Sequence, residues 1–201
     1  TLWIWKSAFW LAFAIVFPLS VGMTALQFAA WSSQPVRATQ AAISPIFTPE
    51  VQAWNEEIQG WAQEYNLDPN LVATVMQIES CGNPRAGSPA GAQGLFQVMP
   101  FHFAEGEDML DPQTNADRGL AYLKSGLELA GGDVGLALAG YNGGHKQIGR
   151  DTGLWPSETR RYFYYGLGIY KDAKSGATSS DRLSEWLEVD GGRLCPSTLT
   201  K

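Results

Sequence analysis

The chain has 201 residues, of which 45% are hydrophobic and 17% are charged. This length suits one folded domain together with additional segments. The formal net charge is −6, so the sequence lacks the positive charge with which nucleic-acid-binding proteins contact phosphates. We therefore expect no nucleic-acid partner.

The N-terminal part of the chain contains a long apolar segment. No charged residue occurs from Ser7 to Ala30, and this length is sufficient to cross a bilayer as a helix. Tryptophans border the segment on both sides, as in the aromatic belts of membrane proteins. We predict a single-pass anchor in the cell membrane over residues 1–31. Lys6 before the segment and only Arg37 soon after it favour an extracytoplasmic domain.

An uncleaved anchor has two alternatives, a cleaved signal peptide and a buried helix of a soluble domain. A cleaved signal peptide has a shorter apolar region, of about 7–15 residues, and small residues at the cut site. A cut after Ala30 would place the bulky Phe28 at one of those positions. A buried helix of a soluble domain is the weaker alternative, because so long a run without charge is rare in a small domain.

The residues after the anchor change in character. Residues 32–47 contain two prolines and no sustained hydrophobic period, which predicts a linker. From Thr48 onward the pattern is helical, and we predict one domain over residues 48–201. Its first helix begins at Thr48-Pro49, with Trp54, Ile58 and Trp61 as the apolar stripe.

Five further helices are indicated by capping residues and by apolar residues at helical spacing. They run from Asp68-Pro69 to Glu79 or Ser80, from Asp111-Pro112 to Gly131-Gly132, from Asp133 to Gly143-Gly144, onward from Pro156, and from Asp181 to Val189. Few segments alternate with period two. Gly94 to Met99 is a candidate strand within a small hairpin or irregular segment, so the predicted fold class is mainly α.

The two cysteines, Cys81 and Cys195, cannot form a zinc site alone. Neither His102 nor His145 lies at a ligand-like spacing from them, so we expect no metal site. In an oxidising compartment one disulfide is the natural interpretation. Two unrelated thiols remain the alternative, because sequence cannot test the geometry of the pair.

Glu79 has an unusual position for a carboxylate. It follows Val72 and Met76 at helical spacing, so it shares a face with apolar side chains. It also lies in the last turn of its predicted helix, where the helix dipole disfavours negative charge. Both effects raise a carboxyl pKa, which suits a general acid. A boundary glutamate whose carboxylate reaches solvent is an equally good interpretation of the position alone.

Four motifs, in order, decide between these interpretations. They are Glu79-Ser80, GAQGLFQVMP from Gly91 to Pro100, ALAGYNGG from Ala137 to Gly144, and ETRRY from Glu158 to Tyr162. Over about Val51 to Lys171 the series resembles the lytic transglycosylases of the soluble-lytic-transglycosylase type, relatives of goose-type lysozyme. Each motif alone is weak, but four in this order are specific.

The resemblance implies a lysozyme-like helical domain that cleaves peptidoglycan glycan strands without a metal or organic cofactor. Phe96 stands where that family usually has Met, and Gly140 where it usually has Ala. Neither change removes a chemical group from the expected site, and Phe96 is expected to be a packing substitution.

By position in the family pattern, Glu79 would be the catalytic acid/base. It would protonate the bond between N-acetylmuramic acid and N-acetylglucosamine, and the primary hydroxyl of the muramic acid would then form an anhydro end. Most glycosidases use two carboxylates. Glu158, at a predicted helix start, is explained by the helix dipole. One acid is enough if the substrate's acetamide acts as an internal nucleophile.

The resemblance also implies a set of substrate-binding residues around the cleft: Ser80, Gln97, Tyr141, Asn142 and Tyr162. Their side chains suit sugar hydroxyl and acetamide groups. For two of them a structural role remains open. Asn142 precedes two glycines and would fit a helix C-terminus, and Tyr162 lies in an aromatic run that would fit the core.

The predicted function is therefore that of a membrane-anchored lytic transglycosylase with peptidoglycan and the lipid bilayer as partners. A goose-type lysozyme, in which water attacks the same bond, is the nearest alternative. A non-catalytic wall-binding module or a subunit of a membrane assembly is the alternative from another class. The sequence identifies no protein partner.

Overall fold

The computed structural model describes residues 42–195, which all belong to one compact unit. The predicted membrane anchor over residues 1–31 lies outside the described residues. Between residues 42 and 195, no helix is both long and apolar enough to cross a bilayer.

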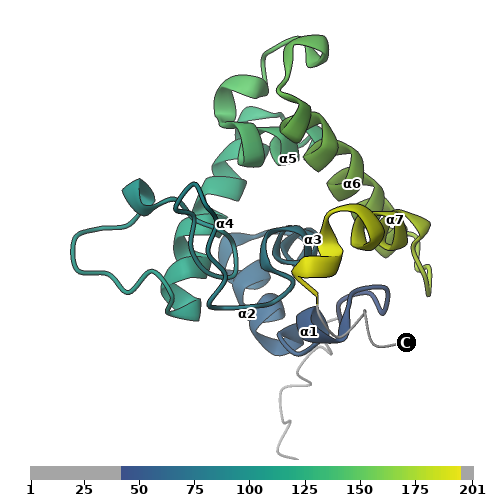
Figure 1. Cartoon of the computed structure of the whole chain (residues 1–201), viewed down its shortest axis with the longest axis horizontal. Coiled ribbons are helices and arrows are strands. Elements are labelled where there is room, and N and C mark those ends of the chain that lie inside the picture. Colours follow the sequence, from purple (N-terminus) through teal and green to yellow (C-terminus); the bar gives the residue numbers. More distant parts are fainter. Residues whose placement is uncertain (1–41, 196–201) are drawn as a thin grey trace, which may run out of the picture. The chain divides into compact units, whose positions relative to one another are not determined.

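Helices make up the regular structure of the described part (Figure 1), in which no β-strand is found. This confirms the predicted mainly α fold class. The α-helices are α1 (Pro49–Gln52), α2 (Asn55–Tyr65), α3 (Pro69–Ser80), α4 (Pro112–Leu129), α5 (Val134–Gly143), α6 (Ser157–Lys174) and α7 (Asp181–Val189). The described residues also form short 3-10 helices: η1 (Pro100–His102), η2 (His145–Gln147) and η3 (Thr152–Leu154) lie between α-helices, and η4 (Gly191–Arg193) follows α7.

Local capping chemistry sets the helix starts. The carboxylates of Asp68, Asp111 and Asp133 accept hydrogen bonds from the backbone N–H groups of Asn70, Thr114 and Leu136, so each caps the helix that follows. Proline occupies the first turn of both α3 and α4, where its missing N–H costs nothing. These starts confirm the predictions made from the sequence.

The first predicted helix is divided in two. α1 ends at Gln52 and α2 begins at Asn55, because Trp54 leaves the helical conformation and its indole N–H donates to the carbonyl of Gly82 at 2.8 Å. The Thr48 side chain does not cap α1; its hydroxyl donates to Gln77 Oε1 instead, at 3.2 Å. The predicted single helix is thus wrong at this point.

The end of the predicted linker belongs to the folded domain. Ile43, Ile46 and Phe47 are buried in the hydrophobic core. The backbone N–H of Ile43 donates to the Asn55 side chain at 3.0 Å. The domain boundary therefore lies several residues before the predicted one at Thr48.

α3 is the central helix of the unit, because eight of its twelve residues are buried. It packs against α1, α2 and α6, while α5 lies between α4 and α6 (Figure 1). α7 follows along α6. This packing fixes α3, and with it the position of Glu79 in the last turn of the helix.

The segment between α3 and η1 is irregular and contains only two isolated β-bridges, which pair Gln93 with Gly87 and with Val98. The candidate strand from Gly94 to Met99 is therefore not formed, and the alternative of an irregular segment holds. The buried Asn115 of α4 holds the segment instead: its amide donates to the carbonyls of Gln93 and Met109, and its Oδ1 accepts from the N–H of Phe96. Two of these hydrogen bonds, those with Gln93 and Phe96, hold the segment in place of a strand ladder.

Candidate active site

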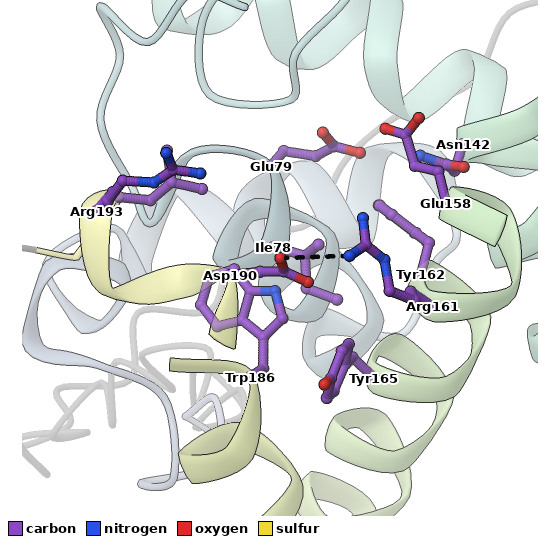
Figure 2. A pocket seen from close by; sticks show the side chains of 11 residues that line it. Ile78, Glu79, Asn142, Glu158, Arg161, Tyr162, Tyr165, Trp186, Asp190 and Arg193 are labelled. Carbon is purple, nitrogen blue, oxygen red and sulfur yellow. Dashed lines mark ion pairs between the residues drawn. The ribbon is translucent and has the colours of Figure 1, made fainter. Parts of the chain in front are cut away.

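Glu79 is partly buried and faces a pocket of about 240 Å³ (Figure 2). The pocket is small beside the roughly 300–1,000 Å³ that is usual for ligand sites. It is lined by residues of α3, α5, α6, α7 and the segment after α7, which are Ile78, Glu79, Asn142, Glu158, Arg161, Tyr162, Tyr165, Trp186, Asp190, Arg193 and Leu194.

Burial raises the pKa of Glu79 from an ordinary 4.5 to about 8. The negative charge of Glu158, across the pocket, adds to the rise, and the nearby Tyr162 hydroxyl opposes it. Desolvation dominates because a charged carboxylate loses more hydration free energy than a neutral carboxyl when water is removed. At neutral pH the Glu79 carboxyl therefore holds a proton that it can transfer.

Two tyrosines lie close to the Glu79 carboxyl. Burial and the Glu79 charge raise the pKa of Tyr141 and of Tyr162 well above 10, so both hydroxyls stay protonated. The rings stack with centroids 6.4 Å apart. The Tyr141 hydroxyl donates to the carbonyl of Phe96 at 2.8 Å, whereas the buried Tyr162 hydroxyl has no partner at ordinary hydrogen-bond geometry within residues 42–195.

Asn142 lies in the last turn of α5 and lines the pocket beside Glu158 (Figure 2). Its Oδ1 accepts from the Thr159 hydroxyl at 2.9 Å. That bond fixes the amide plane and directs the NH₂ group away from Thr159. The residue that ends the helix is Gly144, so Asn142 does not serve as the cap that its position before two glycines suggested.

Three of the five predicted substrate-binding residues, Tyr141, Ser80 and Gln97, are not in the pocket lining. Ser80 is fully buried, and its hydroxyl donates to the carbonyl of Leu95 at 2.7 Å. Gln97 has a left-handed backbone with φ 46°, and its amide donates to the carbonyl of Gly94 at 3.0 Å. Ser80 thus joins α3 to the segment that carries Gln97, rather than facing the pocket itself.

The two departures from the family pattern have packing explanations. Phe96 is fully buried, and its ring meets Trp61 edge-on with centroids 5.8 Å apart, as expected for a packing substitution. A Cβ at Gly140 would lie 2.8 Å from the side chain of Ile148. Ile148 thus occupies the volume that an alanine methyl would need.

Sequence reasoning missed four charged residues of the pocket. In the sequence the helix dipole alone accounts for Glu158, and no sequence pattern places Arg161, Asp190 or Arg193 in a pocket. The Arg161 guanidinium lies 3.8 Å from the Asp190 carboxylate. The predicted disulfide was the available signal, because Cys195 brings residues 190–194 to the end of α3.

The disulfide itself is present, as predicted, between Cys81 and Cys195, with Cα atoms 5.4 Å apart. Cys81 follows α3 directly, in the left-handed conformation. Both cysteines are buried. The bond thus attaches the end of α7 and η4 to the chain two residues from Glu79.

The fold belongs to a class already seen in solved structures. It is similar to the 70-kDa soluble lytic transglycosylase solved in complex with bulgecin A, with a TM-score of 0.53 and 23% sequence identity. The similarity covers 71% of this chain and 25% of that one. At this level of identity, the comparison shows the fold alone.

The chain belongs to the family of the transglycosylase SLT domain, which matches residues 56–162. The match includes Glu79 and every predicted substrate-binding residue. It ends within α6, so α7, η4 and the residues that they contribute to the pocket follow the matched region.

Curated relatives share this region. A transglycosylase of Enterobacteria phage PRD1 is 41% identical over 111 residues, covering 54% of this chain and 40% of the relative. Membrane-bound lytic murein transglycosylase E of Buchnera aphidicola is 32% identical over 83 residues, covering 35% and 38%. Soluble lytic murein transglycosylase of Escherichia coli is 28% identical over 108 residues, covering 48% and 17%. The chain thus spans less than half of each relative.

Proposed function

We propose that this protein is a lytic transglycosylase that cleaves the bond between N-acetylmuramic acid and N-acetylglucosamine in peptidoglycan. The observation that carries the proposal is a pocket-facing Glu79 whose pKa is raised to about 8, at the position of the catalytic glutamate in the SLT family pattern. Membership of the family and the names of its relatives support the substrate class.

Glu79 acts twice in the proposed reaction. Its carboxyl first donates a proton to the glycosidic oxygen, the bond from that oxygen to the anomeric carbon breaks, and the acetamide oxygen stabilises the carbon by bonding to it. The Glu79 carboxylate then removes the proton of the muramic acid's primary hydroxyl. The hydroxyl oxygen bonds to the anomeric carbon, the acetamide is released, and the Glu79 carboxyl is regenerated.

The surrounding residues divide into contacts and supports. The Tyr162 hydroxyl, which lies beside Glu79, and the Asn142 amide line the pocket, and we assign them hydrogen bonds to the sugar. Tyr141 and Ser80 use their hydroxyls on the carbonyls of Phe96 and Leu95, so we assign them the support of the segment that leads to Gln97.

Digestion of purified sacculi tests the proposal through its products. We expect mass spectrometry to find anhydro-muramyl ends, because the Glu79 carboxylate activates the substrate's own hydroxyl. Reducing ends alone would instead show water as the attacking group, which is the reaction of a goose-type lysozyme. Intact sacculi would show that the domain binds the wall without cleaving it.

The same digestion has an expected pH dependence. Glu79 must be protonated to act first as an acid, so kcat/KM should fall about tenfold per pH unit once the pH exceeds its pKa of about 8. Glu158→Gln removes a charge that raises this pKa and should move the fall to lower pH. Tyr162→Phe removes an effect that lowers the pKa and should move it to higher pH. Shifts in the same direction would contradict this electrostatic account.

We also propose that residues 1–31 anchor the domain in the cell membrane, with the active site extracytoplasmic. The charge-free segment from Ser7 to Ala30 supports this, and one relative is named a membrane-bound transglycosylase. Because Ile43 is already packed in the domain, the connection is residues 32–42, at most about 40 Å when extended.

Carbonate washing of membranes tests the anchor. The protein should stay in the pellet, and N-terminal sequencing should find residues that precede Ser7. A protein that begins at residue 32, exported with a cleavable signal peptide, serves as the control. It should be released from the membranes by the wash. Native material that is soluble and begins after Ala30 would contradict the anchor and leave the proposed chemistry unaffected.

A further inference from the structure

One wall of the pocket is built from chain that lies beyond the family match at residue 162. Trp186, Asp190, Arg193 and Leu194 line it, and they belong to α7 and the segment up to Cys195. Trp186 is buried in the core, and the disulfide of Cys195 fixes the far end of the segment. This wall of the pocket is therefore fixed at both ends, as expected for a surface that binds substrate.

The charged side chains of this pocket are unevenly placed. Figure 2 shows Arg193 on one side of Glu79 and Glu158 on the other. Arg161 is paired with Asp190, at 3.8 Å. Arg193 is exposed, and within residues 42–195 no carboxylate lies within ion-pair distance of it. The pocket thus presents an unneutralised guanidinium at one side and a carboxylate at the other.

We propose that Arg193 binds a carboxylate carried on the substituent of the muramic acid, a role that rests on the proposed function. Muramic acid differs from N-acetylglucosamine by a lactyl ether. That ether ends in a carboxylate on bare glycan strands and continues into a peptide with acidic residues on intact ones. A guanidinium binds such a carboxylate through two parallel hydrogen bonds.

The opposite charges of Arg193 and Glu158 favour one orientation of the bound sugar. Glu158 repels an anionic substituent, while Arg193 attracts it, so the muramic acid is favoured in the orientation that places its substituent toward η4. The charge of Arg161 is offset by Asp190, 3.8 Å away, whereas no carboxylate within residues 42–195 pairs with Arg193. The small volume of the pocket suits a substituent or a single ring better than a length of glycan strand.

Binding measurements in the Glu79→Gln background test this role without turnover. By calorimetry, we compare E79Q with E79Q/R193Q for three tetrasaccharides: one with peptide stems, the same after amidase treatment, and chitotetraose, which has no carboxylate. We expect R193Q to weaken binding of carboxylated glycans about tenfold, as for one lost charge-assisted pair, and to leave chitotetraose unchanged. Added salt should reduce the difference.

The pattern of losses identifies the source of the carboxylate. If only the stem-bearing glycan binds more weakly, the carboxylate belongs to the peptide. If the amidase-treated glycan also binds more weakly, the carboxylate belongs to the lactyl group. Both results support the proposal.

Arg193→Lys should restore part of the affinity. Arg150 is an exposed arginine outside the pocket, so Arg150→Gln is the matched control. Equal affinities for all three glycans, or an equal loss for chitotetraose, would overturn it. Failure of the proposed function would appear separately, as intact sacculi with the unaltered protein.

Discussion

Replacing Glu79 with glutamine should lower cleavage of sacculi by at least the roughly hundredfold that general acid–base catalysis contributes. Glutamine has nearly the same shape but no proton to transfer, and it cannot accept the proton of the muramic acid hydroxyl in the second step. Release of soluble muropeptides, followed over time at pH 7, measures the effect. Near-normal release by this variant would remove Glu79 from the mechanism.

The stability of the same variant tests whether misfolding, rather than the missing proton, explains its loss of cleavage. The folded protein keeps the Glu79 proton up to a pH of about 8, against an ordinary pKa of 4.5. The folded state therefore binds more protons than the unfolded state between these values, and stability falls as the pH rises through them. A neutral glutamine avoids this loss, so E79Q should be more stable at pH 8, on the order of 2 kcal/mol. Thermal unfolding at pH 5 and pH 8 compares the two proteins.

Breaking the disulfide should have the largest effect on stability. The bond joins residues 114 positions apart, and closing a loop of this size contributes about 4–5 kcal/mol in the chain-entropy model. Its loss also frees the wall that carries Arg193. We expect denaturant unfolding to show the decrease for Cys195→Ser, and calorimetry to show weaker binding of carboxylated glycans.

The double variant Cys81→Ser/Cys195→Ser provides the control. It should match the reduced wild-type protein in stability, and reductant should not change it further. Its chitotetraose affinity reports whether Glu79 and the rest of the pocket stay in place, because Cys81 is two residues from Glu79. If reductant left the stability of the wild-type protein unchanged, the stabilising role of the disulfide would be contradicted.

The helix starts could be predicted where the residues that determine them are close together in the sequence. Asp68, Asp111 and Asp133 cap their helices through bonds to residues two or three positions away, so a short window of sequence contains the whole interaction. The division between α1 and α2 could not be predicted in this way. It depends on a bond between Trp54 and Gly82, which are adjacent only in the folded chain.

The candidate site also has some features that nearby residues determine and others that depend on residues distant in the sequence. The helical spacing of Glu79 after Val72 and Met76 indicated a raised pKa, since burial on one helix face is a local property. A solvent-exposed carboxylate fitted that spacing equally well, and the four motifs decided between the two interpretations. The charge of Glu158, which adds to that rise, comes from a different helix. Arg193 is an isolated arginine in the sequence, and only the pairing of Cys81 with Cys195 places it beside Glu79.

Asn115 makes the segment before η1 depend on a helix that follows it in the chain. Its side chain, on α4, bonds to Gln93 and Phe96 within that segment and to Met109 after η1. A fragment that ends before α4 would therefore contain Glu79 but lack the hydrogen bonds that shape the segment leading to Gln97.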